Sequence, residues 1–148
     1  MQARMDYTKA APEAFRAVLA LERYVQECGL PPHLIHLIKL RASQINGCAF
    51  CVDMHVKEAR KAGHSEQWIA LVAAWHESPV YAPAERALLA WTEALTNVAQ
   101  TRAPDADFAP LREHFTEAQI AQLTVAIATI NVWNRLAVGF RAQHPIDK

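Results

Sequence analysis

The fold class of this chain follows from TEAQIAQLTVAIATINVWNRLAVGFRA, which spans residues 116–142. Thr116 and Gln119 form a capping-box pair that starts a helix. If that helix continues to about residue 142, it is about 27 residues and about 40 Å long. Its apolar residues surround the axis: Ile120, Leu123, Val125, Ile127, Ile130, Trp133, Leu136 and Phe140. Such a helix is buried, either centrally in one subunit or between subunits. Asn131 and Asn134 on its apolar arc are predicted to be structural ties, because buried amides need partners.

The remainder of the chain also has helical patterning. Start and stop signals delimit segments at about residues 12–28, 31–46, 48–62, 65–75, 83–100 and 104–115. No run alternates apolar and polar residues between turn markers, as a half-buried strand would. The sequence therefore predicts an all-α bundle of about six to seven helices. We expect one domain over residues 1–148, with its core at about 12–142. A long buried helix in so short a chain also favours an oligomer.

Composition narrows the possible function classes. The chain has 148 residues, of which 52% are hydrophobic and 20% charged, as in a folded globular protein. Its formal net charge is zero, so no bulk attraction favours nucleic acid, an anionic membrane or an acidic substrate. The first ten residues do not have the pattern of a signal peptide, and no stretch approaches the about 18 apolar residues of a membrane span. We therefore expect a cytoplasmic protein with neither nucleic acid nor membrane as its partner.

The motif that carries chemistry is Cys48-Ala-Phe-Cys51, followed four residues later by His55. On a helix these three side chains share one face, because positions i, i+3 and i+7 fall within a narrow arc. The rest of that arc is apolar, which predicts that the thiols face the interior. Burial raises the pKa of a thiol, but a helix start and a nearby imidazole both favour the thiolate. The direct interpretation is attack by a Cys51 thiolate on an electrophile, with Cys48 resolving the product as a disulfide.

Three alternatives remain open for this motif. The first is a zinc site, whose fourth ligand could be His33, His36 or His64. The second is plain packing of small core cysteines, with the motif's histidine satisfied internally. The third is a redox-sensing or partner-binding module, in which a disulfide alters an oligomer surface around the apolar pair Phe50 and Met54.

Two other classes of CxxC protein are excluded. Attachment of c-type haem requires a histidine directly after the second cysteine, where this chain has Val52. A thioredoxin fold places the motif after a strand, and the sequence contains no strand signal. The third cysteine, Cys28, lies beside a helix stop at Gly29 and is predicted to be structural.

The run RASQINGCAFCVDMH, residues 41–55, resembles the alkylhydroperoxidase AhpD-like branch of the carboxymuconolactone decarboxylase-like superfamily. The resemblance continues at EARKAG (58–63) and at WNRL (133–136), and it covers most of residues 12–142. It implies an AhpD-like all-α fold that assembles as homotrimers or homohexamers. It also implies a dithiol peroxidase or disulfide reductase of antioxidant defence.

In family terms, Cys48 and Cys51 would be the redox pair and His55 part of a proton relay, with no metal, haem or other cofactor required. One position departs from the pattern: peroxidase members carry a relay Glu twelve residues before the first cysteine, where this chain has His36. An imidazole can relay protons, but it cannot supply the fixed negative charge of a carboxylate. Glu58, one turn after His55, is a candidate substitute for orienting the imidazole.

The sequence thus predicts a cytoplasmic, thiol-dependent peroxidase-type oxidoreductase that reduces an alkyl hydroperoxide or another small electrophile. Cys51 would attack the peroxide bond to give a sulfenic acid, and Cys48 would condense with it to form the disulfide. A dithiol or protein reductant would then restore the thiols by exchange. His55, as acid and base, and His36, as a relay, complete the predicted site. The superfamily's decarboxylases generally lack the CxxC pair, which argues against that chemistry here.

Overall fold

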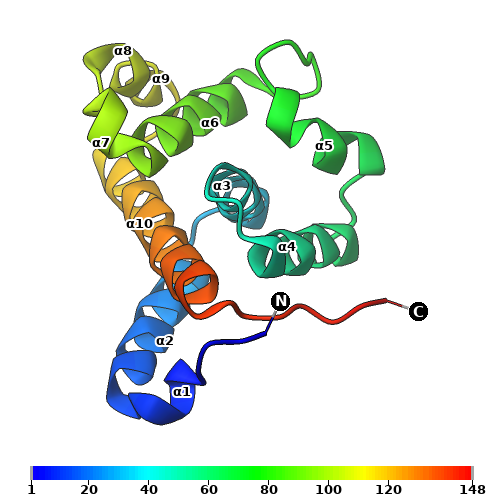
Figure 1. Ribbon diagram of the computed structural model, residues 1–148. Coiled ribbons are helices and arrows are strands. Elements are labelled where there is room, and N and C mark those ends of the chain that lie inside the picture. The colour runs from blue at the N-terminus through cyan, green and yellow to red at the C-terminus, as the bar shows by residue number, and fades with distance from the viewer. Residues whose placement is uncertain (1, 148) are drawn as a thin grey trace.

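The computed structural model describes residues 2–147, and every regular element within them is helical (Figure 1). The long helices are α2 (Pro12–Glu27), α3 (Pro32–Ile45), α4 (Ala49–Lys61), α6 (Pro83–Thr96) and α10 (Glu117–Phe140). Shorter elements flank or connect them: α1 (Tyr7–Ala10), α5 (Glu66–Ala70) with the 3-10 turn η1 (Leu71–Ala74), α7 (Val98–Thr101), α8 (Asp105–Phe108) and α9 (Leu111–His114). The predicted all-α class is confirmed.

Three of the expected helices are interrupted. The segment expected at residues 83–100 breaks at Asn97, whose side chain donates to the Glu93 carbonyl (3.1 Å) and competes with the next helical turn. The segment 104–115 divides into the single turns α8 and α9 around Pro110, because proline has no N–H to continue the helix. The segment expected at 65–75 is α-helical only in α5 and continues as the 3-10 turn η1, whereas α1 is additional to the sequence prediction. The long segments of strong helical pattern agree with it.

The helix at the centre of the bundle is α3, which Figure 1 shows between α4, α6 and α10. Its buried residues are Leu34, Ile35, Leu37, Ile38, Lys39, Leu40, Ala42 and Ser43. The apolar helix α10 was expected either at the centre of a subunit or between subunits. One side of it packs mainly on α2, α3 and α6, with further contacts to α4 and α9. Its other side carries a stripe that is exposed or half-buried and includes Ala121, Val125, Ala128 and Val132. A place for α10 between subunits remains a prediction.

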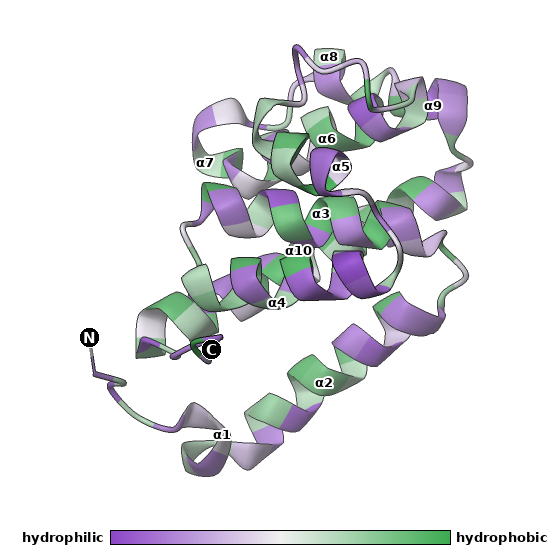
Figure 2. Ribbon diagram, turned by 90° about the vertical axis from the view of Figure 1, so that its right-hand side faces the viewer, coloured by the Kyte–Doolittle hydropathy of each residue, from purple (hydrophilic) through white to green (hydrophobic). Residues whose placement is uncertain are grey.

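Apolar side chains form two main clusters, one on each side of α3. The first lies towards α2, α6 and α10 and includes Ile38, Leu88, Leu123, Ile127 and Ile130. The second lies towards α4, α5 and η1 and includes Leu37, Leu40, Ala59, Val72 and Leu89. Apolar and polar residues alternate along α2 and α4 in Figure 2, as expected of helices that bury one face. The helix α4, which carries the CxxC motif, is therefore held on α3 by its apolar side.

By length and composition alone, α10 would also pass as a membrane span. The sequence-based exclusion of any such segment was therefore too strict. Its contacts give a different explanation, because α10 packs against α2, α3, α4, α6 and α9 and places the amide of Asn134 in a polar network there. The core helix of a bundle needs the same apolar composition as a span. We therefore describe α10 as a core helix.

Candidate active site

A tight turn between α3 and α4 places the two cysteines. Gly47 adopts a left-handed conformation there (φ +63°), in which a side chain would be strained. The backbone N–H of Cys48 donates to the Ser43 carbonyl (3.0 Å), and Cys48 is the N-cap residue of α4. Cys51 follows in the first turn of the helix. Both cysteines therefore lie at the positive end of the α4 dipole, as the sequence predicted.

Amide side chains fix this turn from behind. Nδ2 of Asn46 donates to Oδ1 of Asn131 (3.0 Å) and to Oδ1 of Asn134 (2.9 Å), which joins the end of α3 to α10. Asn134 in turn donates to Oγ of Ser43 (3.0 Å), and Asn131 donates to Oγ1 of Thr96 (3.2 Å). The prediction that the two α10 amides are structural ties is confirmed. They hold the residues that precede the CxxC motif in place.

Cys48 and Cys51 are joined by a disulfide, with their Cα atoms 5.3 Å apart. Each residue is only 2% exposed. The backbone N–H of Cys51 donates to Sγ of Cys48 (3.3 Å), so a negative charge on that sulfur would be stabilised by the helix terminus. The two cysteines are thus close enough to act as one redox pair.

His55 lies one turn after Cys51 on α4 and is 2% exposed. Its Nδ1 is 2.7 Å from Oε2 of Glu58. A carboxylate at this position favours the tautomer that carries the proton on Nδ1, and leaves Nε2 unprotonated. Within residues 2–147, Nε2 has no hydrogen-bond partner, so it is available to a thiol or a substrate. The hydrogen bond from His55 holds the pKa of Glu58 below its ordinary value of 4.5.

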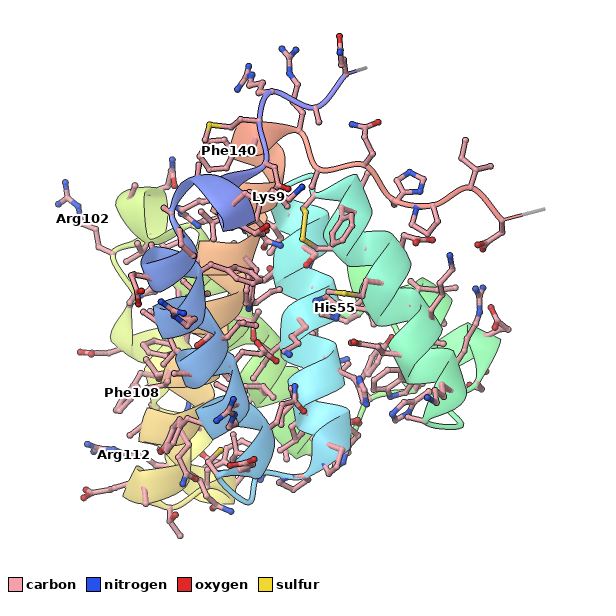
Figure 3. The ribbon with its side chains drawn as sticks, turned by 90° about the horizontal axis from the view of Figure 1, so that it is seen from below. Lys9, His55, Arg102, Phe108, Arg112 and Phe140 are labelled. Atoms are coloured by element: carbon pink, nitrogen blue, oxygen red, sulfur yellow. A yellow bond between two sulfur atoms is a disulfide. The ribbon has the colours of Figure 1, made fainter. Side chains whose placement is uncertain are left out.

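Cys51 and His55 open onto one pocket of about 350 Å³. Figure 3 shows the imidazole of His55 between α3 and α4. The apolar walls of the pocket come from Tyr7, Phe15, Phe50, Met54, Trp133 and Ala137. Its polar part comes from Glu22, Lys39 and Glu58. A small organic molecule in this pocket would meet a sulfur, an imidazole and an aromatic wall together, the combination typical of a ligand site.

A buried ion pair on the pocket wall was missed by the sequence analysis. Lys39 of α3 is 4% exposed and pairs with Glu22 of α2. Glu22 also accepts hydrogen bonds from Nε1 of Trp133 (3.1 Å) and Nε2 of Gln26 (2.8 Å). Burial would raise the pKa of Glu22, but the hydrogen bonds from Lys39, Gln26 and Trp133 outweigh burial and hold the pKa below 4.5. The available signal was a single lysine within the apolar run Leu34–Leu40, since a charge in such a run needs a buried partner.

His36 lies outside the pocket that contains the sulfur and the imidazole. It lines a second pocket of about 390 Å³, which it shares with Lys39 and Glu58. Burial, and then the neighbouring His64, lower the pKa of His36, while Glu58 acts against both. His36 itself is half-buried, and Lys39 and Ser43 on the same side of α3 are buried. Of the four predicted site residues, the structure brings Cys48, Cys51 and His55 together on α4, and Glu58 lies between them and His36.

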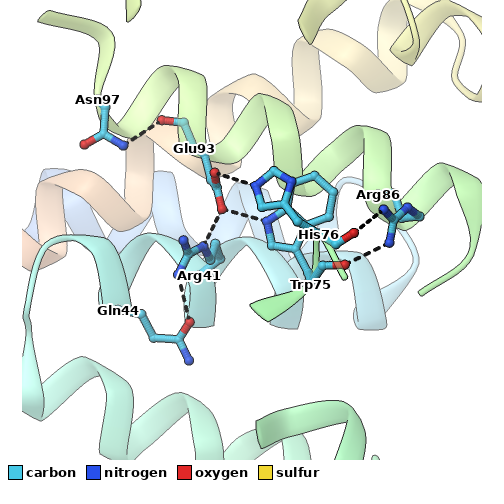
Figure 4. Close-up of polar contacts among 7 residues, drawn as sticks. All are labelled: Arg41, Gln44, Trp75, His76, Arg86, Glu93 and Asn97. Carbon is cyan, nitrogen blue, oxygen red and sulfur yellow. Dashed lines mark hydrogen bonds and ion pairs between the residues drawn. The ribbon is translucent and has the colours of Figure 1, made fainter. Parts of the chain in front are cut away.

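Arg41, seven residues before Cys48, makes contacts that are structural. Figure 4 shows Arg41 of α3 beside Glu93 of α6, with a distance of 2.7 Å from Nε to the carboxylate. Glu93 also accepts from Nε1 of Trp75 (2.6 Å) and lies near His76. Burial would raise the pKa of Glu93, but the hydrogen bonds from Trp75 and Arg41 hold it below 4.5. This cluster joins α3, α6 and the end of η1. None of its residues lines the dithiol pocket.

The alternatives to a redox pair find less support. No group of three or more histidine, cysteine or acidic side chains within residues 2–147 is placed to hold a metal ion, so the zinc alternative lacks a ligand set in this arrangement. Cys28 is half-buried and donates through Sγ to the Val25 carbonyl (3.3 Å), which agrees with a structural role. Phe50 and Met54, considered as a partner surface, both line the pocket beside Cys51.

The chain matches the carboxymuconolactone decarboxylase family over residues 12–94. YdfG of Bacillus subtilis (strain 168) is 40% identical over 138 residues, which are 93% of this chain and 94% of YdfG. A solved structure from Agrobacterium tumefaciens, of a protein of unknown function proposed to be the antioxidant defence protein AhpD, is 62% identical, with a TM-score of 0.97 over 99% of this chain and 100% of that chain.

The debrominase Bmp8, solved in complex with 2,3,4-tribromopyrrole, has a TM-score of 0.84 over 93% of this chain and 74% of that chain. It is 20% identical, so this likeness shows the fold alone. The family match runs from the start of α2 into α6 and includes the whole of the CxxC segment. This chain therefore belongs to the carboxymuconolactone decarboxylase family, in its AhpD-like branch.

Proposed function

We propose that this protein is a thiol-dependent peroxidase-type oxidoreductase of antioxidant defence. One observation carries the proposal: Cys51 shares an apolar pocket with the unpartnered Nε2 of His55 and is bonded to Cys48. A sulfur, a base and a second sulfur are the groups that a peroxide-reducing dithiol requires. The family membership and the resemblance to a proposed antioxidant protein agree with this activity.

The reaction would proceed in two steps. The Cys51 thiolate attacks one oxygen of a hydroperoxide, the O–O bond breaks, and the departing alkoxide takes the proton from the His55 imidazolium. The product is a sulfenic acid on Cys51 and an alcohol. The Cys48 thiolate then attacks the Cys51 sulfur, and the sulfenic oxygen leaves as water once it has taken a proton. The expected product of this half-reaction is a disulfide between Cys48 and Cys51, the bond that joins them in the structure.

A dithiol or protein reductant supplies the two electrons that reopen the disulfide. The substrate is a peroxide or another small electrophile that fits a pocket of about 350 Å³. We further propose that the protein works in the cytoplasm as a homotrimer or homohexamer. Reducing compartments keep a CxxC pair in its dithiol form, which is the form that this reaction consumes.

The proposal is tested by hydroperoxide-dependent loss of thiols in the reduced protein. The wild-type protein should lose two thiols for each peroxide consumed. Cys51→Ser should react at least about tenfold more slowly, while Cys48→Ser should form a sulfenic acid on Cys51 that a dimedone probe traps. Cys28→Ser is the matched control and should behave as the wild type. Equal peroxide consumption in all four proteins would refute the proposal.

A further inference from the structure

The two cysteines of the disulfide line two different, adjacent spaces. Cys51 lines the pocket that contains His55. Cys48 lines a separate groove of about 340 Å³ between the start of α4 and the segment that follows α10. Phe50 and Ala137 line both spaces, so they form the wall between them. A molecule in the groove would therefore meet Cys48 without displacing a substrate beside Cys51.

The charges of the two spaces also differ. The pocket beside Cys51 is lined by the carboxylates of Glu22 and Glu58 and by the ammonium group of Lys39, which pairs with Glu22, so negative charge is in excess there. The groove beside Cys48 is lined by Arg141 and His144, and its lining residues, all within the described part of the chain, include no carboxylate. Arg4 lies at the same end of the bundle, where its guanidinium donates to the Gly139 carbonyl (2.8 Å). The groove therefore attracts anions to the sulfur of Cys48.

Initial attack on Cys48 is also favoured because each thiolate that leaves, first that of Cys51 and then that of Cys48, lies next to a stabilising group. When a thiolate attacks Sγ of Cys48, the S–S bond breaks and Cys51 leaves as a thiolate, next to the imidazole of His55. A second thiolate then attacks the donor sulfur of the mixed disulfide, and Cys48 leaves. Its negative charge is stabilised by the backbone N–H of Cys51 at the start of α4. The donor is oxidised to its disulfide, and each protein sulfur gains one electron.

We propose that the reductant enters through the Cys48 groove, attacks Cys48 first, and is selected there as a thiol that carries additional negative charge. This assignment rests on the proposed dithiol function and names the reductant class for the same site. Substrate and reductant then approach the disulfide from opposite sides of the Phe50 wall. The preference for an anionic thiol depends on Arg141. This residue is exposed and adopts a left-handed conformation (φ 57°) directly after α10.

The first test measures reduction of the oxidised protein by three small thiols: 2-mercaptoethanesulfonate, 2-mercaptoethanol and cysteamine. Rates are compared per thiolate, so that differences in thiol acidity do not enter. We expect the anion to react about three- to tenfold faster than the cation, because of charge steering. Arg141→Asn should lower the ratio of the rate with 2-mercaptoethanesulfonate to the rate with cysteamine by at least about threefold. Equal rates for all three thiols in the wild-type protein would overturn the proposal.

A matched control exists within the chain. Arg102 is also exposed and also adopts φ 57° directly after a helix, so Arg102→Asn makes the same chemical change in the same backbone conformation. It should keep the wild-type preference for the anionic thiol. Asparagine tolerates this conformation, which keeps both variants folded. A loss of preference in Arg102→Asn equal to that in Arg141→Asn would overturn the proposal.

The second test identifies the sulfur that is attacked. Cys51→Ser and Cys48→Ser are each combined with Cys28→Ser, so that one thiol remains, and the reduced proteins are treated with the anionic reagent 5,5′-dithiobis(2-nitrobenzoate). The lone Cys48 should form the mixed disulfide faster than the lone Cys51, and Arg141→Asn should slow only the reaction of Cys48. Faster reaction of Cys51, or equal slowing of both, would overturn the assignment. No peroxide is used, so this result is separate from a failure of the proposed peroxidase activity.

Discussion

The imidazole of His55 is polarised from one side only. Its Nδ1 contacts the carboxylate of Glu58 at 2.7 Å, and its Nε2 has no partner within residues 2–147. Both residues belong to α4, three positions apart, so the geometry of the helix itself sets their relation. The family pattern places a relay carboxylate on the preceding helix, at the position of His36. Here a carboxylate contacts the imidazole from Glu58, on the same helix as Cys51, and we propose that it takes that role.

Glu58→Gln tests whether that charge matters to the reaction. Glutamine can still accept from Nδ1, but it cannot stabilise the imidazolium, so we expect thiol oxidation by peroxide to slow by about tenfold. The acidic limb of the pH–rate profile should also shift. Stopped-flow measurement of thiol loss from about pH 5 to about pH 9 checks both effects. Glu66→Gln, at an exposed carboxylate paired with Arg60, is the control, and identical profiles for the two variants would contradict the role of Glu58.

At the scale of elements, α3 does more than connect helices. It lies at the centre of the bundle, carries Lys39 to the pocket wall, and ends in the turn that positions Cys48. The ion pair of Lys39 with Glu22 joins α3 to α2, and the bond from Trp133 to Glu22 adds α10. Three helices thus meet at one carboxylate beside the dithiol pocket. Breaking such a pair leaves a buried charge without compensation.

Lys39→Met should therefore destabilise the fold by about 3 kcal/mol, since it strands the Glu22 carboxylate. The double variant Glu22→Gln with Lys39→Met leaves no unpaired charge and should recover more than half of that loss. Urea unfolding followed by tryptophan fluorescence measures both free energies. Lys61→Met, at an exposed position on α4, is the control and should stay close to the wild type. Simple additivity of the two single substitutions would show that the pair is not coupled.

At the scale of the whole molecule, α10 has one covered and one open side. Ala121 and Ala128 on the open side are exposed, and Val125 and Val132 beside them are half-buried. An apolar stripe of this kind on the longest helix of the fold is costly in water unless another surface covers it. The predicted homotrimer or homohexamer would provide that surface.

Ala128→Glu tests this arrangement in solution. The residue is exposed within one subunit, and glutamate is a good helix former, so the subunit itself should stay folded. A carboxylate buried at a subunit interface would be strongly unfavourable, and the assembly should dissociate to a smaller species. Light scattering after size exclusion gives the mass. Val98→Glu, at an exposed valine of α7, should keep the wild-type mass. An unchanged mass for Ala128→Glu would place the interface elsewhere.

The free energy of unfolding should decrease as the pH falls. The pKa values of Glu22, Glu58 and Glu93 lie below 4.5, and those of His36 and His64 lie below 6.5. In each case the unfolded chain binds protons more readily than the folded one, so stability is complete above the unfolded pKa and falls with falling pH. We expect urea midpoints to decrease slightly from about pH 7.5 to about 5.5 and further by about 3.5. A midpoint that rises on acidification would contradict these assignments.

Local spacing was sufficient for much of this protein. The all-α class, the long helices and the common face of Cys48, Cys51 and His55 depend on residues within a few turns of one another, where the period of 3.6 makes definite neighbours. The short elements were less predictable. At Asn97 and Pro110 a single side chain breaks a pattern that is otherwise helical, so the boundary depends on one competing hydrogen bond or one missing donor.

What faces the thiols was settled by packing. Tyr7 and Trp133 come from opposite ends of the chain, and Glu22 and Lys39 from two different helices, yet all four line the pocket of Cys51. Which helix faces meet depends on the summed fit of many side chains, and no spacing along the chain encodes that sum. The same packing leaves His36 outside the pocket. The sequence alone therefore identified the two cysteines of the dithiol, whereas the chemical environment of each sulfur exists only in the folded protein.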